Sequence, residues 1–308
     1  MIGGGIMPET INPLRYPGAK RLLVNYIDAL LEANHLYGCT FFEPYAGSAV
    51  VGLELLQQGH IDHLLLCEKD ILLYAFWECV FNDTENLISK IENTVISIET
   101  WQRELPYREM TSLTQAELLE LGFAGLFFNR TNFSGILKAN PIGGIQQTSQ
   151  YGIDCRFNKQ KIIEIIRRLS AHRENVDVYC DDALHFMASQ NNRFLRESCF
   201  AYFDPPYYEK GSKIYRHYYT NQGHIDLAKY VRGVHNLDWI ISYDDAPFIC
   251  GLYSDSGARY QPFFLDYTCA SKVRTQGQEL LISKYIENHT DYIGNIDNEY
   301  LKSVNKKA

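Results

Sequence analysis

The chain has 308 residues, of which 46% are hydrophobic and 21% are charged, and its formal net charge is −8. This length suits one large α/β domain or a core domain with a smaller insertion, and the composition excludes a disordered chain. The longest apolar run, at 71–81, is too short to span a bilayer, and the first residues do not read as a signal peptide, so we expect a cytoplasmic protein.

Eight cysteines are scattered along the chain without a C-x-x-C pair, and most of them lie in apolar runs. This usage is typical of free thiols packed in a reduced interior. We therefore expect no metal site.

Short apolar runs predict seven buried strands, at 39–44, 63–68, 176–180, 199–204, 238–244, 263–268 and 279–285. Helical periodicity fills most of the gaps between them, as in GSAVVGLELLQQ and HIDLAKYVRGVH. Strands that alternate with helices indicate a parallel, doubly wound sheet.

Residues 71–175 break this alternation, because they carry helical patterns and no convincing strand. Two helices are predicted there, at 86–101 and 158–173, with a Gly- and Gln-rich loop between them. We interpret the region as a mostly helical insertion between the second and third strands. The insertion would take residues 83–175, which leaves 1–82 and 176–308 for the main domain.

The insertion also carries the basic charge of an otherwise acidic chain. From residue 123 to residue 175 there are eight basic and three acidic residues, a local balance of +5. This asymmetry favours a nucleic-acid partner, although a solvated helix face is the alternative.

The ends of the first two predicted strands are candidates for cofactor binding. The first strand ends at Glu43, and a turn of small residues at 46–48 leads into a helix. Glycine lets a backbone approach a ligand, and a helix N-terminus offers unpaired N–H groups; an ordinary tight turn is the alternative. The second strand ends at Glu68, whose carboxylate could accept two hydrogen bonds from a ribose diol, or could be a surface acid.

The fourth predicted strand ends in the tetrapeptide DPPY, at 204–207. Proline lacks the N–H that a strand needs, so this pair stops the strand and stiffens the backbone. Asp204 and the Pro205 carbonyl could then accept the two hydrogens of an exocyclic amine, which localises the nitrogen lone pair. Tyr207 offers a face on which a base could stack. A purely structural turn is the alternative.

These motifs, in this order, resemble the Dam-like class of N6-adenine-specific DNA methyltransferases over nearly the whole chain. PLRYPGAKRLL is similar to the N-terminal motif of that class, FFEPYAGSAV to its S-adenosylmethionine loop, CEKD to its ribose acid and YFDPPYY to its catalytic tetrapeptide. The resemblance implies a Rossmann-like class I methyltransferase sheet, mostly parallel with an antiparallel last strand. It also implies that the main domain is catalytic and that the helical insertion recognises the target.

The same resemblance implies a set of site residues. Asp182 would contact the adenine of the cofactor, with Asp181 as the neighbouring alternative. The catalytic residues would be Asp204, Pro205, Pro206 and Tyr207. S-adenosylmethionine would be bound by Tyr16, Gly18, Lys20, Glu43, Pro44, Tyr45, Ala46, Gly47, Ser48, Glu68, Lys69, Asp181, Asp182 and Asp204.

Two segments are candidates for DNA contact. FFNRTNFSGILKANPIGG is similar to the recognition stretch of the family, in which Arg130 and Asn132 would read bases or phosphates, although Arg130 could instead form a structural salt bridge. The stretch departs after Asn140 from members that read GATC. After the tetrapeptide, basic residues alternate with tyrosines, which suits a loop that holds phosphates; an ordinary exposed loop is the alternative. The DNA-binding candidates are Arg130, Asn132, Ser134, Lys138, Lys210, Lys213 and Arg216.

Together these features predict a site-specific enzyme that transfers a methyl group from S-adenosylmethionine to N6 of adenine in double-stranded DNA by base flipping. It would act alone or with a companion nuclease or defence-system subunit. The same chemistry on RNA or on a protein amide is a second hypothesis. A non-catalytic DNA-binding member of the fold is a third.

Overall fold

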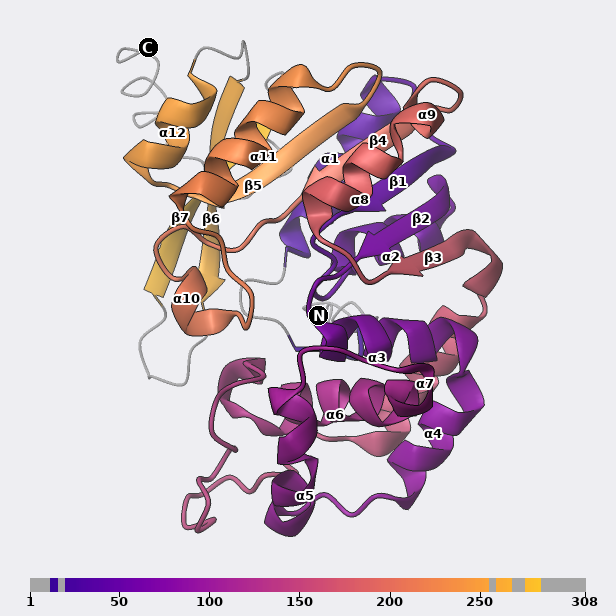
Figure 1. Cartoon of the computed structure of the whole chain (residues 1–308), viewed down its shortest axis with the longest axis vertical. Coiled ribbons are helices and arrows are strands. Elements are labelled where there is room, and N and C mark those ends of the chain that lie inside the picture. Colours follow the sequence, from indigo (N-terminus) through magenta and orange to yellow (C-terminus); the bar gives the residue numbers. More distant parts are fainter. Residues whose placement is uncertain (1–11, 16–19, 255–258, 268–274, 284–308) are drawn as a thin grey trace, which may run out of the picture.

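The computed structural model describes residues 12–15, 20–254, 259–267 and 275–283 (Figure 1). Two of the expected cofactor residues, Tyr16 and Gly18, lie outside these ranges. Within them, every helix is too short or too polar to cross a lipid bilayer. The seven cysteines in the described part of the chain carry free thiols.

A seven-stranded sheet forms the centre of the fold, in the order β3-β2-β1-β4-β5-β7-β6. The strands β1 to β5 are parallel neighbours, whereas β7 runs antiparallel to both β5 and β6. The mixed α/β architecture and the antiparallel last strand are therefore confirmed. The strands are Cys39–Glu43 (β1), Ile61–Cys67 (β2), Val176–Tyr179 (β3), Cys199–Phe203 (β4), Asp238–Asp244 (β5), Arg259–Tyr267 (β6) and Thr275–Ser283 (β7).

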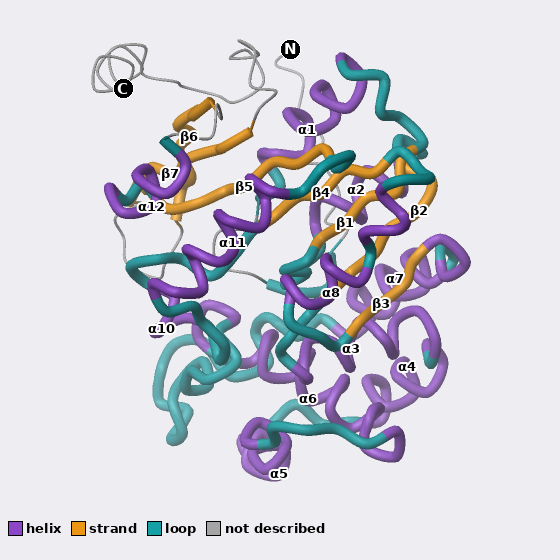
Figure 2. The backbone as a smooth tube through the Cα atoms, turned by 45° about the horizontal axis from the view of Figure 1, so that its top comes forward, coloured by secondary structure: helices purple, strands orange, loops and turns teal. Residues whose placement is uncertain are grey.

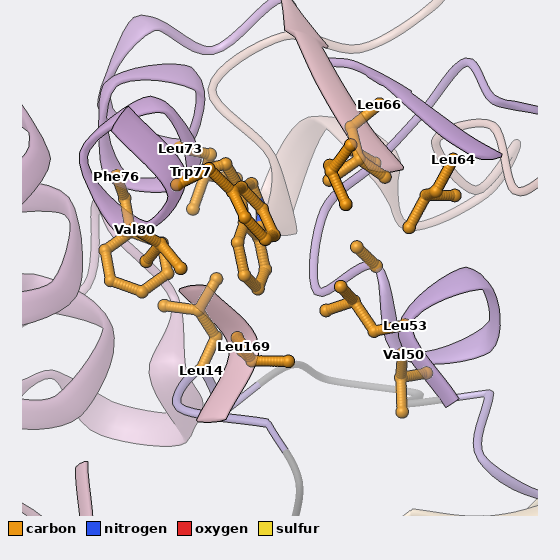
Figure 3. Close-up of a cluster of buried hydrophobic side chains, with 14 of the residues drawn as sticks. Leu14, Val50, Leu53, Leu64, Leu66, Leu73, Phe76, Trp77, Val80 and Leu169 are labelled. Atoms are coloured by element: carbon orange, nitrogen blue, oxygen red, sulfur yellow. The ribbon is translucent and has the colours of Figure 1, made fainter. Parts of the chain in front are cut away.

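Successive residues of the central strands face opposite sides of the sheet, and both sides are covered. Phe41 of β1 belongs to a core cluster with helices on one face, and Phe42 belongs to a second cluster on the other face. Burial on both faces explains why these strands are continuous apolar runs rather than alternating ones. Figure 3 shows part of the first cluster, in which Leu64 and Leu66 of β2 lie with Leu53 and Trp77 from two covering helices.

The helices of the main domain divide between these two faces. Those that contribute to the first cluster are α1 (Leu22–Ala33), α2 (Val50–Gln58) and α3 (Ile71–Asn82). The other face carries α8 (Ala183–Ser189), α9 (Asn191–Phe194), α11 (Asn221–Gly233) and α12 (Pro247–Tyr253), and Figure 2 shows α8 and α11 lying across the strands. The short helix α10 (Gly211–Ile214) lies in the loop after the tetrapeptide.

Between β2 and β3 the chain forms helices rather than strands, and all of them except α3 lie within the predicted insertion at 83–175. These are α3 (Ile71–Asn82), α4 (Thr84–Asn93), α5 (Ile98–Glu109), α6 (Leu118–Thr131) and α7 (Lys159–Ser170), with short 3₁₀ turns at Gln115–Glu117, Phe133–Gly135 and Arg173–Asn175. In Figure 1 they occupy the lower part of the molecule. Their core is continuous with the first cluster of the sheet.

The single helix predicted at 86–101 is wrong, because the structure divides it into α4 and α5. Between them lies the β-branched run Thr94–Ile96, which is unfavourable in a helix. Ser97 then begins α5 by accepting a hydrogen bond from the Thr100 backbone N–H at 3.3 Å.

The helices α3 and α6 approach each other closely because α6 has two glycines at the contact. A Cβ added at Gly125 would lie 2.4 Å from the Leu72 carbonyl oxygen, and one at Gly122 would lie 2.7 Å from the Ala75 carbonyl oxygen. These distances leave no room for a side chain without separating the helices.

We therefore expect Gly125→Ala to lower the free energy of unfolding by about 1–3 kcal/mol, measured by urea denaturation. Gly233→Ala is the matched control, because a Cβ at that helical position would meet nothing within 4 Å. The control should be neutral or slightly stabilising. Equal effects of the two substitutions would contradict this account of the packing.

Candidate active site

The carboxyl ends of β1, β2 and β4 open onto one cavity of about 270 Å³, which is also lined by the helical insertion and by the loop after the tetrapeptide. The insertion contributes Gly135–Leu137, and the loop contributes 214–219. The expected site residues that line it are Lys20, Glu43, Pro44, Tyr45, Ala46, Gly47, Ser48, Glu68, Lys69, Asp182, Asp204, Pro206 and Arg216. Motifs far apart in the sequence thus meet at one place.

The turn after β1 is held open by its neighbours. Gly47 has a φ of 47°, in the left-handed region that favours glycine. Its carbonyl accepts a hydrogen bond from Trp77 Nε1 at 2.9 Å, and its N–H donates to Glu68 Oε2 at 2.9 Å. The Asn12 side chain donates to the Ser48 carbonyl. The backbone is therefore preorganised along the cavity wall.

Both acids at the strand ends line the cavity, Glu43 as a buried residue and Glu68 as a half-buried one. Glu43 is buried, and its carboxylate accepts a hydrogen bond from the Gly52 N–H; burial raises the pKa of Glu43 to about 8. Glu68 accepts one backbone N–H on each oxygen, from Gly47 at 2.9 Å and from Asp70 at 2.8 Å. Burial, reinforced by the negative charge of Asp70, raises the pKa of Glu68 to about 7.

Of the two neighbouring aspartates after β3, only Asp182 lines the cavity. It caps α8 by accepting from the Leu184 N–H at 3.1 Å, and it pairs with Lys69 at 3.0 Å. Asp181 instead contacts His185 Nδ1 at 2.6 Å and is not among the lining residues. The geometry favours Asp182 of the two alternatives.

Asp204 sits at the end of β4 in a network of polar side chains. Its Oδ1 accepts from Ser242 Oγ at 2.6 Å and lies 3.3 Å from Lys20 Nζ. Ser242 lies 2.9 Å from the Tyr202 hydroxyl. Burial raises the pKa of Asp204, and the nearby Lys20 opposes that rise.

The structure does not bring the Tyr207 ring to the cavity, although it lies in the predicted tetrapeptide. The side chain is only 5% exposed, and its hydroxyl contacts Lys20 Nζ at 3.1 Å and Glu279 Oε1 at 2.8 Å. The Tyr215 ring lies against it, with 6.1 Å between centroids. Tyr215 lines the cavity, whereas Tyr207 is not among its lining residues.

The sequence analysis missed three polar residues in the network around Asp204 and Lys20: Tyr202, Ser242 and Glu279. Tyr202 and Ser242 lie inside apolar strands, where their hydroxyls look like core positions. Glu279 precedes the apolar run LLIS instead of following it. The sequence did carry a signal for Glu279. In an antiparallel strand, the residue before the apolar run lies beside the carboxyl ends of the neighbouring parallel strands.

In the predicted recognition stretch, Arg130 and Asn132 form hydrogen bonds within the protein. Asn132 is fully buried: its Oδ1 accepts from Trp101 Nε1 at 2.7 Å, and its Nδ2 donates to the carbonyls of Ile136 and Leu137. These bonds fix the loop, and a base-reading role does not fit an amide at this position. Arg130 is partly buried and donates from Nε to the Pro13 carbonyl at 2.5 Å.

Other DNA-binding candidates are placed differently. Ser134 is half-exposed with a φ of 56°, beside the cavity-lining Gly135. Lys210 and Lys213 are exposed. Lys138 donates from Nζ to the carbonyls of Ser212 and Tyr215, so that it ties the insertion to the loop after the tetrapeptide.

Arg216 ties the same loop to the insertion from the other side. Its guanidinium pairs with Asp70, the N-cap of α3, at 2.6 Å, and donates to the Met110 carbonyl at 2.9 Å. Its side chain is 13% exposed, and that of Asp70 is 9% exposed. In this arrangement Arg216 lines the cavity and holds the loop against the start of α3.

We expect Arg216→Met to lower the free energy of unfolding by about 2–4 kcal/mol, because the buried Asp70 carboxylate loses its partner. Urea denaturation measures the loss, and amide hydrogen exchange at 211–219 should rise with it. Arg173→Met is the control, since that side chain is 66% exposed and should matter by less than about 1 kcal/mol. A stable Arg216→Met variant with weakened DNA binding would instead assign Arg216 to phosphate contact.

A family model of the D12 class N6 adenine-specific DNA methyltransferases matches residues 16–262. This span contains the turn at 46–48, the helices between β2 and β3, and the tetrapeptide. No curated protein matches the chain. Enzymes of this class methylate adenine in DNA and take the methyl group from S-adenosylmethionine. The chain belongs to the D12 class of N6 adenine-specific DNA methyltransferases.

Proposed function

We propose that this enzyme methylates adenine N6 at a specific short sequence in double-stranded DNA, and that the target base leaves the helix to reach the cavity. The observation that carries the proposal is the meeting of Asp204 with the cofactor turn in one cavity. An amino group inside a duplex cannot reach a pocket of this kind without base flipping.

The cavity wall fits the cofactor through its backbone and its acids. The turn at 46–48 would lie along the cofactor, Glu68 would accept hydrogen bonds from the ribose hydroxyls, and Asp182 would contact the adenine. Each Glu68 oxygen accepts one backbone N–H and retains a second lone pair for a hydroxyl. S-adenosylmethionine supplies the electrophilic methyl group.

The protein's own part in the reaction is to hold and polarise the target amine. Asp204 would accept one N6 hydrogen and the Pro205 carbonyl the other, which directs the nitrogen lone pair toward the methyl group. Pro206 stiffens the backbone that carries this carbonyl. Much of the rate would come from positioning two reactants rather than from a strong base.

We assign methyl transfer to residues 1–82 and 176–308, and target recognition to 83–175. DNA would lie across the insertion and the carboxyl edge of the sheet, where Ser134 is half-exposed and Lys210 and Lys213 are exposed. We also propose that the enzyme works in the cytoplasm, where DNA and the cofactor are both present. It would act alone or with a companion nuclease or defence-system subunit.

Asp204→Ala should lower methyl transfer to duplex DNA by at least about a hundredfold, because it removes one acceptor of the N6 hydrogens. Cofactor binding, measured by calorimetry, should largely survive. The readout is transfer of labelled methyl groups to unmethylated duplex DNA, with a matched RNA as competitor. Near wild-type transfer by the variant would contradict the mechanism, and preferential methylation of the RNA would support the second hypothesis on substrate.

The affinity for S-adenosylmethionine should depend on pH through Glu68. Its pKa is raised to about 7, so the ionised form that accepts two hydroxyl hydrogens is lost as the pH falls through that value. We expect the dissociation constant to rise by up to about tenfold per pH unit below 7. Calorimetry from pH 5.5 to 8 measures it, and Glu68→Gln should flatten the profile. A flat wild-type profile would exclude Glu68 from this role.

A further inference from the structure

Glu279 is the acid most closely engaged with the tetrapeptide, although it lies on the last strand and does not line the cavity. Its side chain is fully buried. Oε2 lies 2.6 Å from Lys20 Nζ, and Oε1 accepts from the Tyr207 hydroxyl at 2.8 Å. Both oxygens of this one carboxylate are thus committed to residues that contact or belong to the catalytic motif.

The antiparallel direction of β7 explains how an acid ahead of an apolar run reaches this place. Glu279 pairs in register with Asp244, at the carboxyl end of β5. Asp244 in turn accepts the backbone N–H groups of Tyr208 and Glu209, at 2.8 and 2.9 Å. The paired residues Asp244 and Glu279 therefore both hold this part of the chain. Glu279 binds the Tyr207 hydroxyl, and Asp244 binds the backbone just after it.

Lys20 connects Glu279 to the acceptor in the cavity. Its Nζ lies 2.6 Å from Glu279 and 3.3 Å from Asp204, and its side chain is 3% exposed. Burial alone would lower the pKa of Lys20, but the two carboxylates raise it well above its usual value. Lys20 is thus a charged ammonium shared between one acid at the cavity and one behind it.

We propose that Glu279 is a positioning residue for methyl transfer: it orients Tyr207 and, through Lys20, sets the place and charge of the Asp204 carboxylate. This inference rests on the proposed function of the cavity. Without Glu279, the Lys20 ammonium would be free to move fully onto Asp204 and to compete with the target amine for its oxygens.

The proposal predicts opposite effects of the two charges on Asp204. Glu279 raises the pKa of Asp204, whereas Lys20 lowers it. If ionised Asp204 is the active form, activity falls as the pH drops through its pKa. Removing the Glu279 charge should then move the acid limb of kcat to lower pH, and removing the Lys20 charge should move it to higher pH. The titratable and polar groups that face Asp204 are Lys20, Glu43, Tyr202, Ser242 and Glu279.

The experiment compares Glu279→Gln, Lys20→Met and the exposed control Glu32→Gln with wild type, on unmethylated duplex DNA. We expect Glu279→Gln to bind S-adenosylmethionine within about twofold of wild type while kcat falls about 10- to 100-fold, with the two acid limbs displaced in opposite directions. Wild-type kcat and an unmoved pH profile in Glu279→Gln would overturn the proposal.

A variant that keeps the charge covers the case in which Glu279→Gln does not fold. Glu279→Asp should leave the acid limb near its wild-type position and still lower kcat, because its shorter side chain cannot reach both Lys20 and Tyr207. Full activity of Glu279→Asp would contradict the positioning role.

A double-mutant cycle separates this proposal from the function of the cavity. Removing one buried partner leaves an uncompensated charge, so Lys20→Met and Glu279→Gln together should shift the urea midpoint by less than the sum of their single shifts. Additive shifts would refute the coupling even in an active enzyme. If the shifts of the urea midpoint are coupled but the protein methylates no adenine, the Lys20–Glu279 pairing stands and the proposed function is wrong.

Discussion

A buried ammonium group is stable only if carboxylates surround it, and Lys20 meets this requirement by drawing three distant parts of the chain together. Asp204 comes from the end of β4 and Glu279 from β7, while Lys20 itself precedes α1. The electrostatic constraint thus fixes Lys20, the DPPY tetrapeptide and the reversed last strand at one edge of the sheet. The cavity is built on that arrangement.

The fold was largely predictable from the sequence because its strands are buried on both faces. Such strands are short apolar runs that a periodicity argument detects, and all seven were placed to within a few residues. The meeting of the turn at 46–48 with Glu68 in one cavity was also predictable, because parallel strands bring their carboxyl ends to one edge. The break between α4 and α5 was not detected, since it depends on the local competition between an apolar helical period and a β-branched run.

The site was less predictable where a side chain's role depends on partners distant in sequence. Asn132 has the residue type of a base reader, but Trp101 and the carbonyls of its own loop use its amide. Arg216 has the charge of a phosphate ligand, yet Asp70 lies beside it. Glu279 was missed because the rule that strand-end acids follow their strand reverses in an antiparallel strand. Composition identifies such groups, and only the fold decides what they contact.

The most direct test of the central claim is methylation of adenine-unmethylated genomic DNA by the purified enzyme, followed by long-read sequencing that reports modified bases. The account predicts N6-methyladenine in one short recurring sequence, which would establish substrate, product and specificity together. Absence of modified adenine from DNA, with S-adenosylmethionine shown to be bound, would contradict it.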